Sequence, residues 1–410
     1  MSEVNRIEST SENTNAFTPC HSRPSQRVRY LEVGIHKDDI IRNPRNATHL
    51  RFSWTSSHLH SILARRFTGT ILTMVITSQP RAVSSEKRFR FRIETMALQT
   101  LAAIVPLLPH RFLVAFSRAV GGCVYYMLGK PRQIALANLT AAYGNTKSEA
   151  EKQRIARVSF QNFALTMFRL FWSPRLKRGG LEQAVEVDPA SLERIRQLQA
   201  QGKGIIFLVM HYGDWELMGL ATGLLGFPST IVTERMRNAG LEAIFTRLRA
   251  QTGHRIISQR FAVTKLLKAL KRGENIALLI DFNALRDSGG VWVDFFGLPV
   301  YNTAAPAGLA LHTGAPLVFA VPHPLPDGRM RMMYEQLATD VVTADPAVQL
   351  QAISQKCASY CEAVIREQPG PWLWSYKRWR YRLQKAPGAY PFYSHPLHRA
   401  RNTLVTGKSS

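Results

Sequence analysis

The feature that most constrains this chain is a dense apolar run over residues 204–210, which polar residues follow at once. Such runs between glycines are typical of strands buried on both faces of a parallel sheet, because neither face alternates with polar side chains. His211 comes directly after the run, so we expect it at the carboxyl end of the strand, where sites form in open α/β sheets. Asp214 has the side chain of an N-cap, which predicts a helix over residues 215–225 and places Glu216 in its first turn.

Outside this run, the chain alternates between stretches with helical and with strand-like patterns. Helices are expected over residues 131–142, 147–171, 189–201, 238–252, 260–272, 303–313 and 346–367. Further strands are expected over residues 229–233, 275–280, 291–296, 317–321 and 330–336. This alternation predicts an α/β fold, in which a mixed and mostly parallel sheet is flanked by helices on both faces.

His211 and Glu216 have the residue types of a catalytic base and of the acid that orients it. A neutral imidazole can take a proton near neutral pH, and a carboxylate can accept a hydrogen bond from the other ring nitrogen. The two side chains would converge if the strand end contributes one and the helix start the other. The plainer alternative is a structural histidine beside a glutamate that only caps the helix.

The segment over residues 204–219 resembles the His-x4-Asp/Glu block of the lysophospholipid acyltransferase superfamily, in its lipid A biosynthesis (lauroyl/myristoyl) acyltransferase branch. Blocks similar to others of this family follow in the family's order, at residues 233–238 with Arg249 and Gly253, 279–281, 291–297 with Thr303 and Pro306, 313–316 and 371–379. The resemblance extends over about residues 97 to 382. The chain departs from it at Phe282-Asn283, since the family commonly has Gln directly after Asp281, and at Asp214, where many members have Asn.

The resemblance implies an O-acyltransferase that moves a fatty acyl chain from an acyl carrier protein thioester to a hydroxyl or hydroxyacyl group of a glycolipid or phospholipid precursor. The acceptor hydroxyl must lose its proton as it attacks, and His211 is the candidate base. Glu216 would accept a hydrogen bond from the ring and stabilise the imidazolium that forms. Direct attack needs no enzyme nucleophile, so we expect no covalent acyl-enzyme, no cofactor and no metal site.

The remaining blocks of the resemblance imply substrate-binding residues. Arg235 follows the strand predicted over residues 229–233, where its guanidinium could bind phosphate; a solvated helix start is the alternative. Asp281 ends the strand predicted over residues 275–280, either as a site residue or as a carboxylate that caps or fixes a loop. The resemblance alone adds Asn238, Arg249, Phe296 and Gly297. For the last two, a packing and turn role is the alternative.

Four segments follow from composition and from the extent of the resemblance. They are an extension over residues 1–95, a membrane-associated helical segment over 96–130, an acyltransferase domain over 131–385 and a basic tail over 386–410. The extension lacks a sustained apolar period and is expected to be largely disordered, with Met74 and Met96 as alternative starts. The apolar stretches of the second segment are shorter than the about 20 residues of a membrane span. This favours an interfacial hairpin or one tilted span, and a pair of core helices is the alternative.

The formal net charge of +25 predicts anionic partners. No zinc-finger spacing, ribonucleoprotein motif or basic heptad accompanies this charge, so we expect an anionic membrane surface and the acidic acyl carrier protein, and no nucleic acid. Aromatic and basic residues over 372–382 suit a belt at the level of lipid headgroups, and a buried aromatic anchor is the alternative. The four cysteines lack the spacing of a disulfide framework, so we expect the catalytic domain to face the cytoplasm. The resemblance implies that it does so at the inner membrane of a Gram-negative-type bacterium.

Two other functions stay open from the residues alone. A hydrolase of acyl esters or thioesters could use the same histidine and acid, with water as the nucleophile. A basic lipid-binding protein without catalytic activity would show the same charge and the same apolar stretches.

Overall fold

The computed structural model describes residues 85–284, 289–340, 345–385 and 388–397. Its helices are α2 (Ser85–Ile104), η2 (Val105–Leu107), α3 (His110–Met127), α4 (Gly129–Tyr143), α5 (Glu149–Trp172), η3 (Ser173–Arg178), α6 (Leu181–Ala184), α7 (Pro189–Ala200), α8 (Trp215–Leu224), α9 (Ala239–Ala250), α10 (Ala262–Leu270), α11 (Ala305–Thr313) and α12 (Pro346–Glu367). Its strands are β1 (Val185–Val187), β2 (Ile206–Val209), β3 (Ser229–Thr233), β4 (Arg255–Ser258), β5 (Asn275–Leu279), β6 (Gly290–Phe295), β7 (Leu298–Thr303), β8 (Leu317–Pro324), β9 (Met330–Leu337), β10 (Tyr381–Arg382) and β11 (His395–Pro396).

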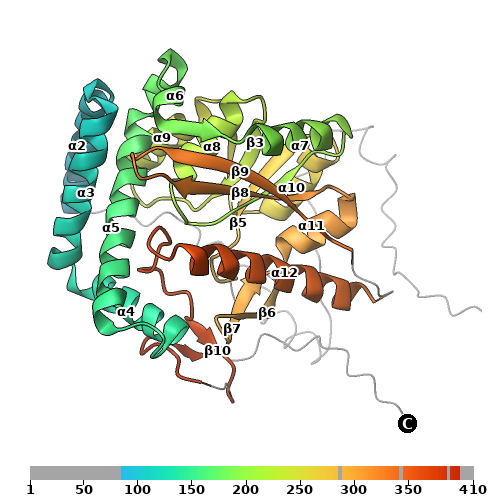
Figure 1. Ribbon diagram of the computed structural model, residues 1–410. Coiled ribbons are helices and arrows are strands. Elements are labelled where there is room, and N and C mark those ends of the chain that lie inside the picture. Colours follow the sequence, from blue (N-terminus) through green and yellow to red (C-terminus); the bar gives the residue numbers. More distant parts are fainter. Residues whose placement is uncertain (1–84, 285–288, 341–344, 386–387, 398–410) are drawn as a thin grey trace, which may run out of the picture. The chain divides into compact units, whose positions relative to one another are not determined.

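Seven strands form one sheet in the order β1-β9-β8-β2-β5-β3-β4 (Figure 1). Every neighbouring pair is parallel except β8 and β9, so the predicted mixed and mostly parallel sheet is confirmed. The chain runs from β2 outward to β3 and β4, returns to insert β5, and later adds β8 on the opposite side of β2. A crevice at such a reversal is where open α/β sheets bind ligands, at the carboxyl ends of their strands.

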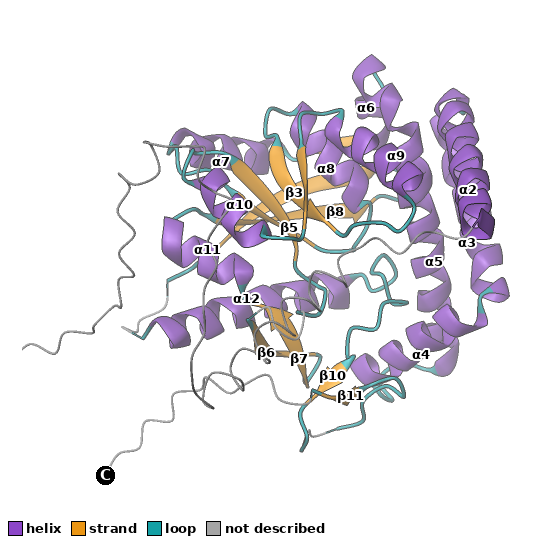
Figure 2. Cartoon of the chain, turned by 180° about the vertical axis from the view of Figure 1, so that it is seen from behind, coloured by secondary structure: helices purple, strands orange, loops and turns teal. Residues whose placement is uncertain are grey.

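Hydrophobic cores lie on both faces of this sheet, as expected for a strand that is apolar on both sides. Ile206 and Leu208 of β2 belong to a cluster with buried residues of α10, α11 and α12. Phe207, between them, belongs to a second cluster with α7, α8 and α9. Figures 1 and 2 show these two groups of helices on opposite faces of the sheet. Each buried aliphatic or aromatic side chain of this kind stabilises the fold by about 1.5–3 kcal/mol, so the burial of β2 contributes to both cores.

The predicted helices and strands are present with boundaries shifted by a few residues, and five strands, β1, β4, β7, β10 and β11, were not predicted. β1 is only three residues long, and β4 is an edge strand in which just one residue, Ile257, is buried. β7 returns from β6 in a two-stranded hairpin outside the main sheet. Short and edge strands lack the apolar period from which a strand is predicted.

The predicted boundary at residue 96 is wrong, because α2 already begins at Ser85. The helix has no buried residue, so its residues before Met96 show no apolar stripe that could have revealed it. Contacts with α9 hold this part of α2 in place: Nδ2 of Asn238 donates to the carbonyl of Phe91 at 3.0 Å and to Glu94 at 3.1 Å. The remainder of the predicted extension, residues 1–84, and residues 398–410 of the predicted tail lie outside the described residues.

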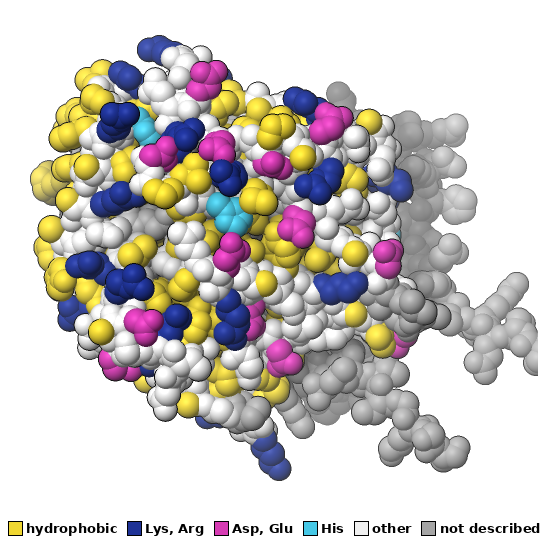
Figure 3. Space-filling view, in the orientation of Figure 1, with side chains coloured by type: hydrophobic (Ala, Val, Ile, Leu, Met, Phe, Trp, Pro, Cys, Tyr) yellow, Lys and Arg dark blue, Asp and Glu magenta, His cyan; other side chains and the backbone are white. Residues whose placement is uncertain are grey.

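Helices α2 and α3 expose large apolar side chains along one side of the molecule. The most exposed on these helices, and on η2 between them, include Phe89, Met96, Leu107, Phe112 and Met127, at 55–78%. In Figure 3, hydrophobic and basic side chains mix along the edge that α2 and α3 form in Figure 1. Among the described residues, no single helix has the length and hydropathy of a membrane span, whereas α3 and α4 together reach it with a bend of 92° between them.

Candidate active site

His211 and Asp281 lie side by side at the carboxyl edge of the sheet. Val209 at the end of β2 is in register with Leu279 at the end of β5, so the residues two positions further on also face each other. Nδ1 of His211 lies 2.8 Å from Oδ1 of Asp281, and the backbone N–H of His211 donates to Oδ2 at 2.9 Å. Both residues are buried, at 7% and 3% exposure. Strand pairing thus joins an imidazole and a carboxylate that are 70 residues apart in the sequence.

Three hydrogen bonds favour the ionised form of Asp281. Two involve His211, and Nε1 of Trp372 donates the third to Oδ2 at 2.9 Å. Burial by itself would favour the neutral acid, but the adjacent His211 ring and these hydrogen bonds lower the pKa of Asp281 below its usual value. An ionised Asp281 accepts the proton on Nδ1, so Nε2 becomes the nitrogen that can take up a proton.

Nε2 of His211 is open to a substrate. Within the described part of the chain, this atom has no hydrogen-bond partner. A hydroxyl that reached Nε2 could therefore transfer its proton there, while Asp281 stabilises the resulting imidazolium. No group of three or more His, Cys, Asp or Glu side chains that could hold a metal ion occurs among the residues that the structure describes.

Glu216, which was predicted to hold His211, has a different partner. Its Oε1 lies 2.5 Å from Nη2 of Arg249, and its Oε2 accepts a hydrogen bond from Nε at 2.9 Å. The first turn of α8 and the last turn of α9 supply the two residues, so the pair joins these helices. Burial opposes the charge of Arg249, but the Glu216 carboxylate raises the pKa of the guanidinium above its usual value. The predicted hydrogen bond from His211 to Glu216 is replaced by the one to Asp281, which strand register places opposite the ring.

Residues of α5 and β8 hold the loop that follows His211. Gly213 has a positive φ of +54°, and a Cβ there would lie 2.1 Å from the carbonyl oxygen of Pro322, so only glycine fits. Nδ2 of Asn162 donates to the carbonyls of Gly213 at 2.7 Å and Pro371 at 3.0 Å. Asp214 caps α8 through Leu217 N, as predicted. These contacts set the position from which the His211 side chain projects.

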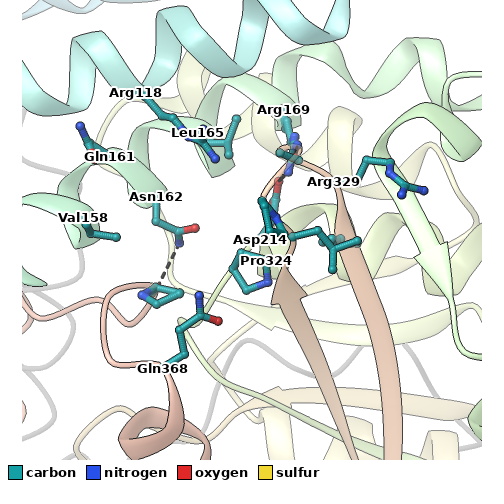
Figure 4. A pocket seen from close by; sticks show the side chains of 15 residues that line it. Arg118, Val158, Gln161, Asn162, Leu165, Arg169, Asp214, Pro324, Arg329 and Gln368 are labelled. Carbon is teal, nitrogen blue, oxygen red and sulfur yellow. Dashed lines mark hydrogen bonds and ion pairs between the residues drawn. The ribbon is translucent and has the colours of Figure 1, made fainter.

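A cavity of about 250 Å³ lies on this supporting side of the loop, between α5 and the loop that joins β8 to β9. Figure 4 shows Arg118 and Asn162 on one wall and Arg329 on the other. Within it, Arg169 forms a buried ion pair with Asp214, with Nη1 and Oδ2 3.1 Å apart. His211 does not line the cavity, so these charges support the loop rather than face the open Nε2.

Arg235 and Asn238 follow β3 at the same edge of the sheet, but only one of them is fixed. Arg235 is exposed, at 84% of its side chain, and its Nε lies 3.9 Å from Glu242. Asn238 is the N-cap of α9 and also bonds to α2, so it has a structural role. Arg235 is therefore the more available of the two for an anionic ligand.

Phe296 and Gly297 form the turn of the β6–β7 hairpin. Phe295 pairs with Leu298, which leaves a two-residue loop whose φ angles of +54° and +74° are those of a type I′ turn. Phe296 is buried, and its backbone N–H donates to Glu362 at 2.6 Å. The alternative of a packing and turn role accounts for both residues in this structure.

The C-terminal tryptophans are buried, which corrects the predicted belt at headgroup level. Trp372, Trp374 and Trp379 are 0–1% exposed and belong to the core on the α12 face of the sheet. The alternative of a buried aromatic anchor is therefore confirmed. Because Trp372 reaches Asp281 from this core, the segment also supports the candidate base, a role that the sequence did not indicate.

Comparison with protein families matches residues 85–381 to the family described as bacterial lipid A biosynthesis acyltransferase. A phosphatidylinositol mannoside acyltransferase of Mycolicibacterium smegmatis is 26% identical over 255 residues, which are 61% of this chain and 80% of that protein. The lipid A biosynthesis lauroyltransferase of Escherichia coli is 22% identical over 322 residues, 77% of this chain and 100% of that protein. A lipid A biosynthesis acyltransferase of Haemophilus influenzae is 24% identical over 194 residues, 47% and 60% of the two chains.

Proposed function

The chain belongs to the bacterial lipid A biosynthesis acyltransferase family and is an acyltransferase, and from this premise we propose that it transfers a fatty acyl chain to a hydroxyl group of a glycolipid. The observation that carries the proposal is the His211–Asp281 pair, with its 2.8 Å contact and its unpartnered Nε2. The names of both kinds of relative describe acyl transfer. One is a phosphatidylinositol mannoside acyltransferase and the other is a lauroyltransferase of lipid A biosynthesis. A glycolipid acceptor is common to both.

The reaction follows from what each side chain can do. Nε2 of His211 takes the proton of the acceptor hydroxyl as its oxygen attacks the carbonyl carbon of an acyl thioester. Asp281 holds the ring through Nδ1 and stabilises the imidazolium, replacing Glu216 in the role predicted from the sequence. When the carbon–sulfur bond breaks, the imidazolium returns the proton to the thiolate. The acyl group never binds the enzyme covalently, so both substrates must be bound at once.

Acyl carrier protein is the proposed donor, and the surface of α10 supports it. Arg260, Lys265, Lys268 and Lys271 are exposed on and beside this helix, and we call them the α10 basic surface. No acidic residue interrupts residues 259–273. β4, which leads into α10, is three strands from β2 in the sheet, or about 14 Å at the usual spacing of strands. An acidic carrier docked there would have its thioester arm within reach of the edge where His211 lies.

The membrane is the proposed location of the acceptor, and it would meet the apolar side of α2 and α3. Exposed aromatic and aliphatic side chains mixed with Lys and Arg are the composition of helices that lie in an anionic membrane interface. In both Figures 1 and 2, α2 and α3 lie on the opposite side of the sheet from α10. A soluble donor could then dock while the enzyme stays on the cytoplasmic face of the inner membrane. Arg235 is the residue we propose for an acceptor phosphate, since it is an exposed cation that follows β3 at the same edge of the sheet as His211.

Lipid analysis tests this proposal directly. Purified protein with acyl carrier protein loaded with a labelled acyl chain, together with a bacterial lipid extract, should yield a glycolipid heavier by one acyl chain in mass spectrometry. His211→Ala should lose this product. Free fatty acid released equally fast without any lipid would instead support a hydrolase. Binding to lipid vesicles with no turnover of any acyl donor would support a lipid-binding protein without activity.

A further inference from the structure

The ring of Phe282 lies flat against the imidazole of His211. Their ring centroids are 4.0 Å apart and their planes differ by 8°. Tyr376 stacks on the other face of Phe282, with centroids 4.1 Å apart and planes 23° apart. Three rings therefore form one continuous stack that ends on the candidate base. Parallel contact of this kind covers one whole face of the imidazole.

Hydrogen bonds hold the outer end of the stack. The hydroxyl of Tyr376 accepts from the backbone N–H of Asn283 at 3.1 Å and from its Nδ2 at 3.0 Å. Nδ2 of Asn283 also donates to the carbonyl of Lys377 at 2.9 Å. Three consecutive residues after β5 thus contact the imidazole and its ring stack. Asp281 binds Nδ1 of the imidazole, Phe282 covers its face, and Asn283 holds Tyr376 through hydrogen bonds.

A second ring shields His211 from another direction. The edge contact with Trp215 has a centroid distance of 5.1 Å and an angle of 64° between the planes. His211 is consequently only 7% exposed, although it lies beyond the end of its strand. Phe282 itself is 36% exposed, so it forms the boundary between the imidazole and solvent.

Water competes with the acceptor in any acyl transfer that uses a general base. If Nε2 takes a proton from water, the water oxygen forms the new bond to the acyl carbon, the carbon–sulfur bond breaks, and a free fatty acid is released. The atoms and protons balance as they do for a lipid hydroxyl, so the base alone does not discriminate. Exclusion of water from the site is the physical means of preventing this side reaction.

We propose that Phe282, backed by Tyr376, is a positioning residue that directs the acyl group to the lipid hydroxyl instead of water. The proposal rests on the acyl transfer proposed above. The stacked ring keeps water from the face of the imidazole and restricts the rotation of that ring, so Nε2 accepts a proton only from a hydroxyl that enters along the remaining approach. Gln, the residue common at this position in the resemblance, would offer polar atoms to water where Phe282 offers none.

The test measures how each variant divides the acyl group between two products. Wild-type protein in detergent micelles is given a labelled acyl carrier protein thioester and a lipid acceptor, and acylated lipid and free fatty acid are quantified together. Phe282→Gln and Phe282→Ala should raise the ratio of free acid to acylated lipid by about threefold to tenfold. Phe282→Tyr keeps a stacked ring and should keep the wild-type ratio. Phe392→Gln, at an exposed aromatic residue in the C-terminal region, is the matched control and should leave the ratio unchanged.

Two results would overturn the inference. One is an equal loss of both products in Phe282→Gln and Phe282→Ala, which would mean that the ring supports only the fold or the rate. The other is an unchanged ratio with unchanged turnover. The ratio is measured on whatever turnover remains, so partial loss of folded protein does not obscure it. If the wild-type protein itself forms no acylated lipid, the proposed function fails; if it does and the ratio does not move, only this inference fails.

Discussion

Oδ1 of Asp281 lies 2.8 Å from Nδ1 of His211, at the ends of two adjacent strands that are in register. The contact places Asp281 where an acid could orient the proposed base, His211. Glu216, which the His-x4-Glu spacing suggested for this role, forms instead an ion pair with Arg249. The motif therefore contains one residue of the proposed catalytic pair and one residue that joins two helices.

Asp281→Asn should lower kcat by a factor on the order of 10² to 10⁴. The amide keeps the shape of the side chain, but its NH₂ group cannot accept the proton on Nδ1, so the ring loses its orientation and its counter-charge. Single-turnover assays with a labelled acyl thioester would measure the change. Glu216→Gln is the comparison, and a drop as large as that of Asp281→Asn would show that Glu216 acts on His211 after all.

The Glu216–Arg249 pair should contribute mainly to stability. Glu216 and Arg249 are 9% and 23% exposed, so the loss of either partner leaves a largely buried charge. Glu216→Gln and Arg249→Gln should each lower the free energy of unfolding by about 1–3 kcal/mol, and the double variant by less than their sum. Denaturant titration of the four proteins in detergent gives this cycle. A loss of unfolding free energy in the double variant equal to the sum of the two single losses would contradict a direct interaction between Glu216 and Arg249.

Aspartate substitutions on α3 should weaken membrane binding. Phe112→Asp combined with Met127→Asp adds two charges to a surface whose residues are 55% and 78% exposed, so the fold should tolerate them. Sedimentation with anionic vesicles should show at least a tenfold weaker partition, since about 0.8 kcal/mol is lost for each buried CH₂ group. Val348→Asp, at a 49% exposed residue of α12, is the control and should bind like wild type.

Charge reversal on the α10 basic surface should impair use of the carrier protein without affecting the chemistry. Lys265→Glu with Lys268→Glu should raise KM for the acyl carrier protein thioester by about tenfold at low salt, and less at high salt, where charges are screened. Turnover of a short soluble acyl thioester should stay the same. Arg194→Glu with Lys203→Glu reverses two exposed charges on α7 and in the turn between α7 and β2. An equal effect of this control pair would indicate net charge instead of a docking site.

His110 should make the fold less stable in mild acid. Burial, followed by the nearby Arg169, lowers the pKa of His110 from 6.5 to about 4. Between these pH values the unfolded chain binds a proton at His110 that the folded chain does not. The contribution of His110 to the free energy of unfolding therefore falls as the pH decreases from 6.5 to 4, and it stays constant above pH 6.5. His110→Gln can still accept a hydrogen bond from Arg169 but does not titrate. Melting curves from pH 4 to pH 7 should therefore show a smaller loss of Tm for the variant than for wild type.

The α/β class and the central strand could be predicted because they depend on local patterns. The apolar residues over 204–210 are buried on both faces wherever such a strand forms, and Asp214 caps the next helix through neighbours in its own turn. Residues 85–95 of α2 could not be predicted, because the helix buries none of its side chains and therefore has no apolar stripe to detect. Its position is stabilised by contacts with Asn238, which lies in a distant part of the chain.

The sequence by itself determined that a base-like histidine would stand at the carboxyl end of a buried strand, since this requires only the apolar run and the residue after it. Only the tertiary structure decided which carboxylate meets that histidine. Asp281 and Glu216 are both acids near strand or helix ends, and the choice depends on β5 inserting beside β2 with Leu279 opposite Val209. The same pairing places Phe282 on the imidazole. Strand order and register are properties of the folded sheet, because they arise from hydrogen bonds between segments that no local pattern relates.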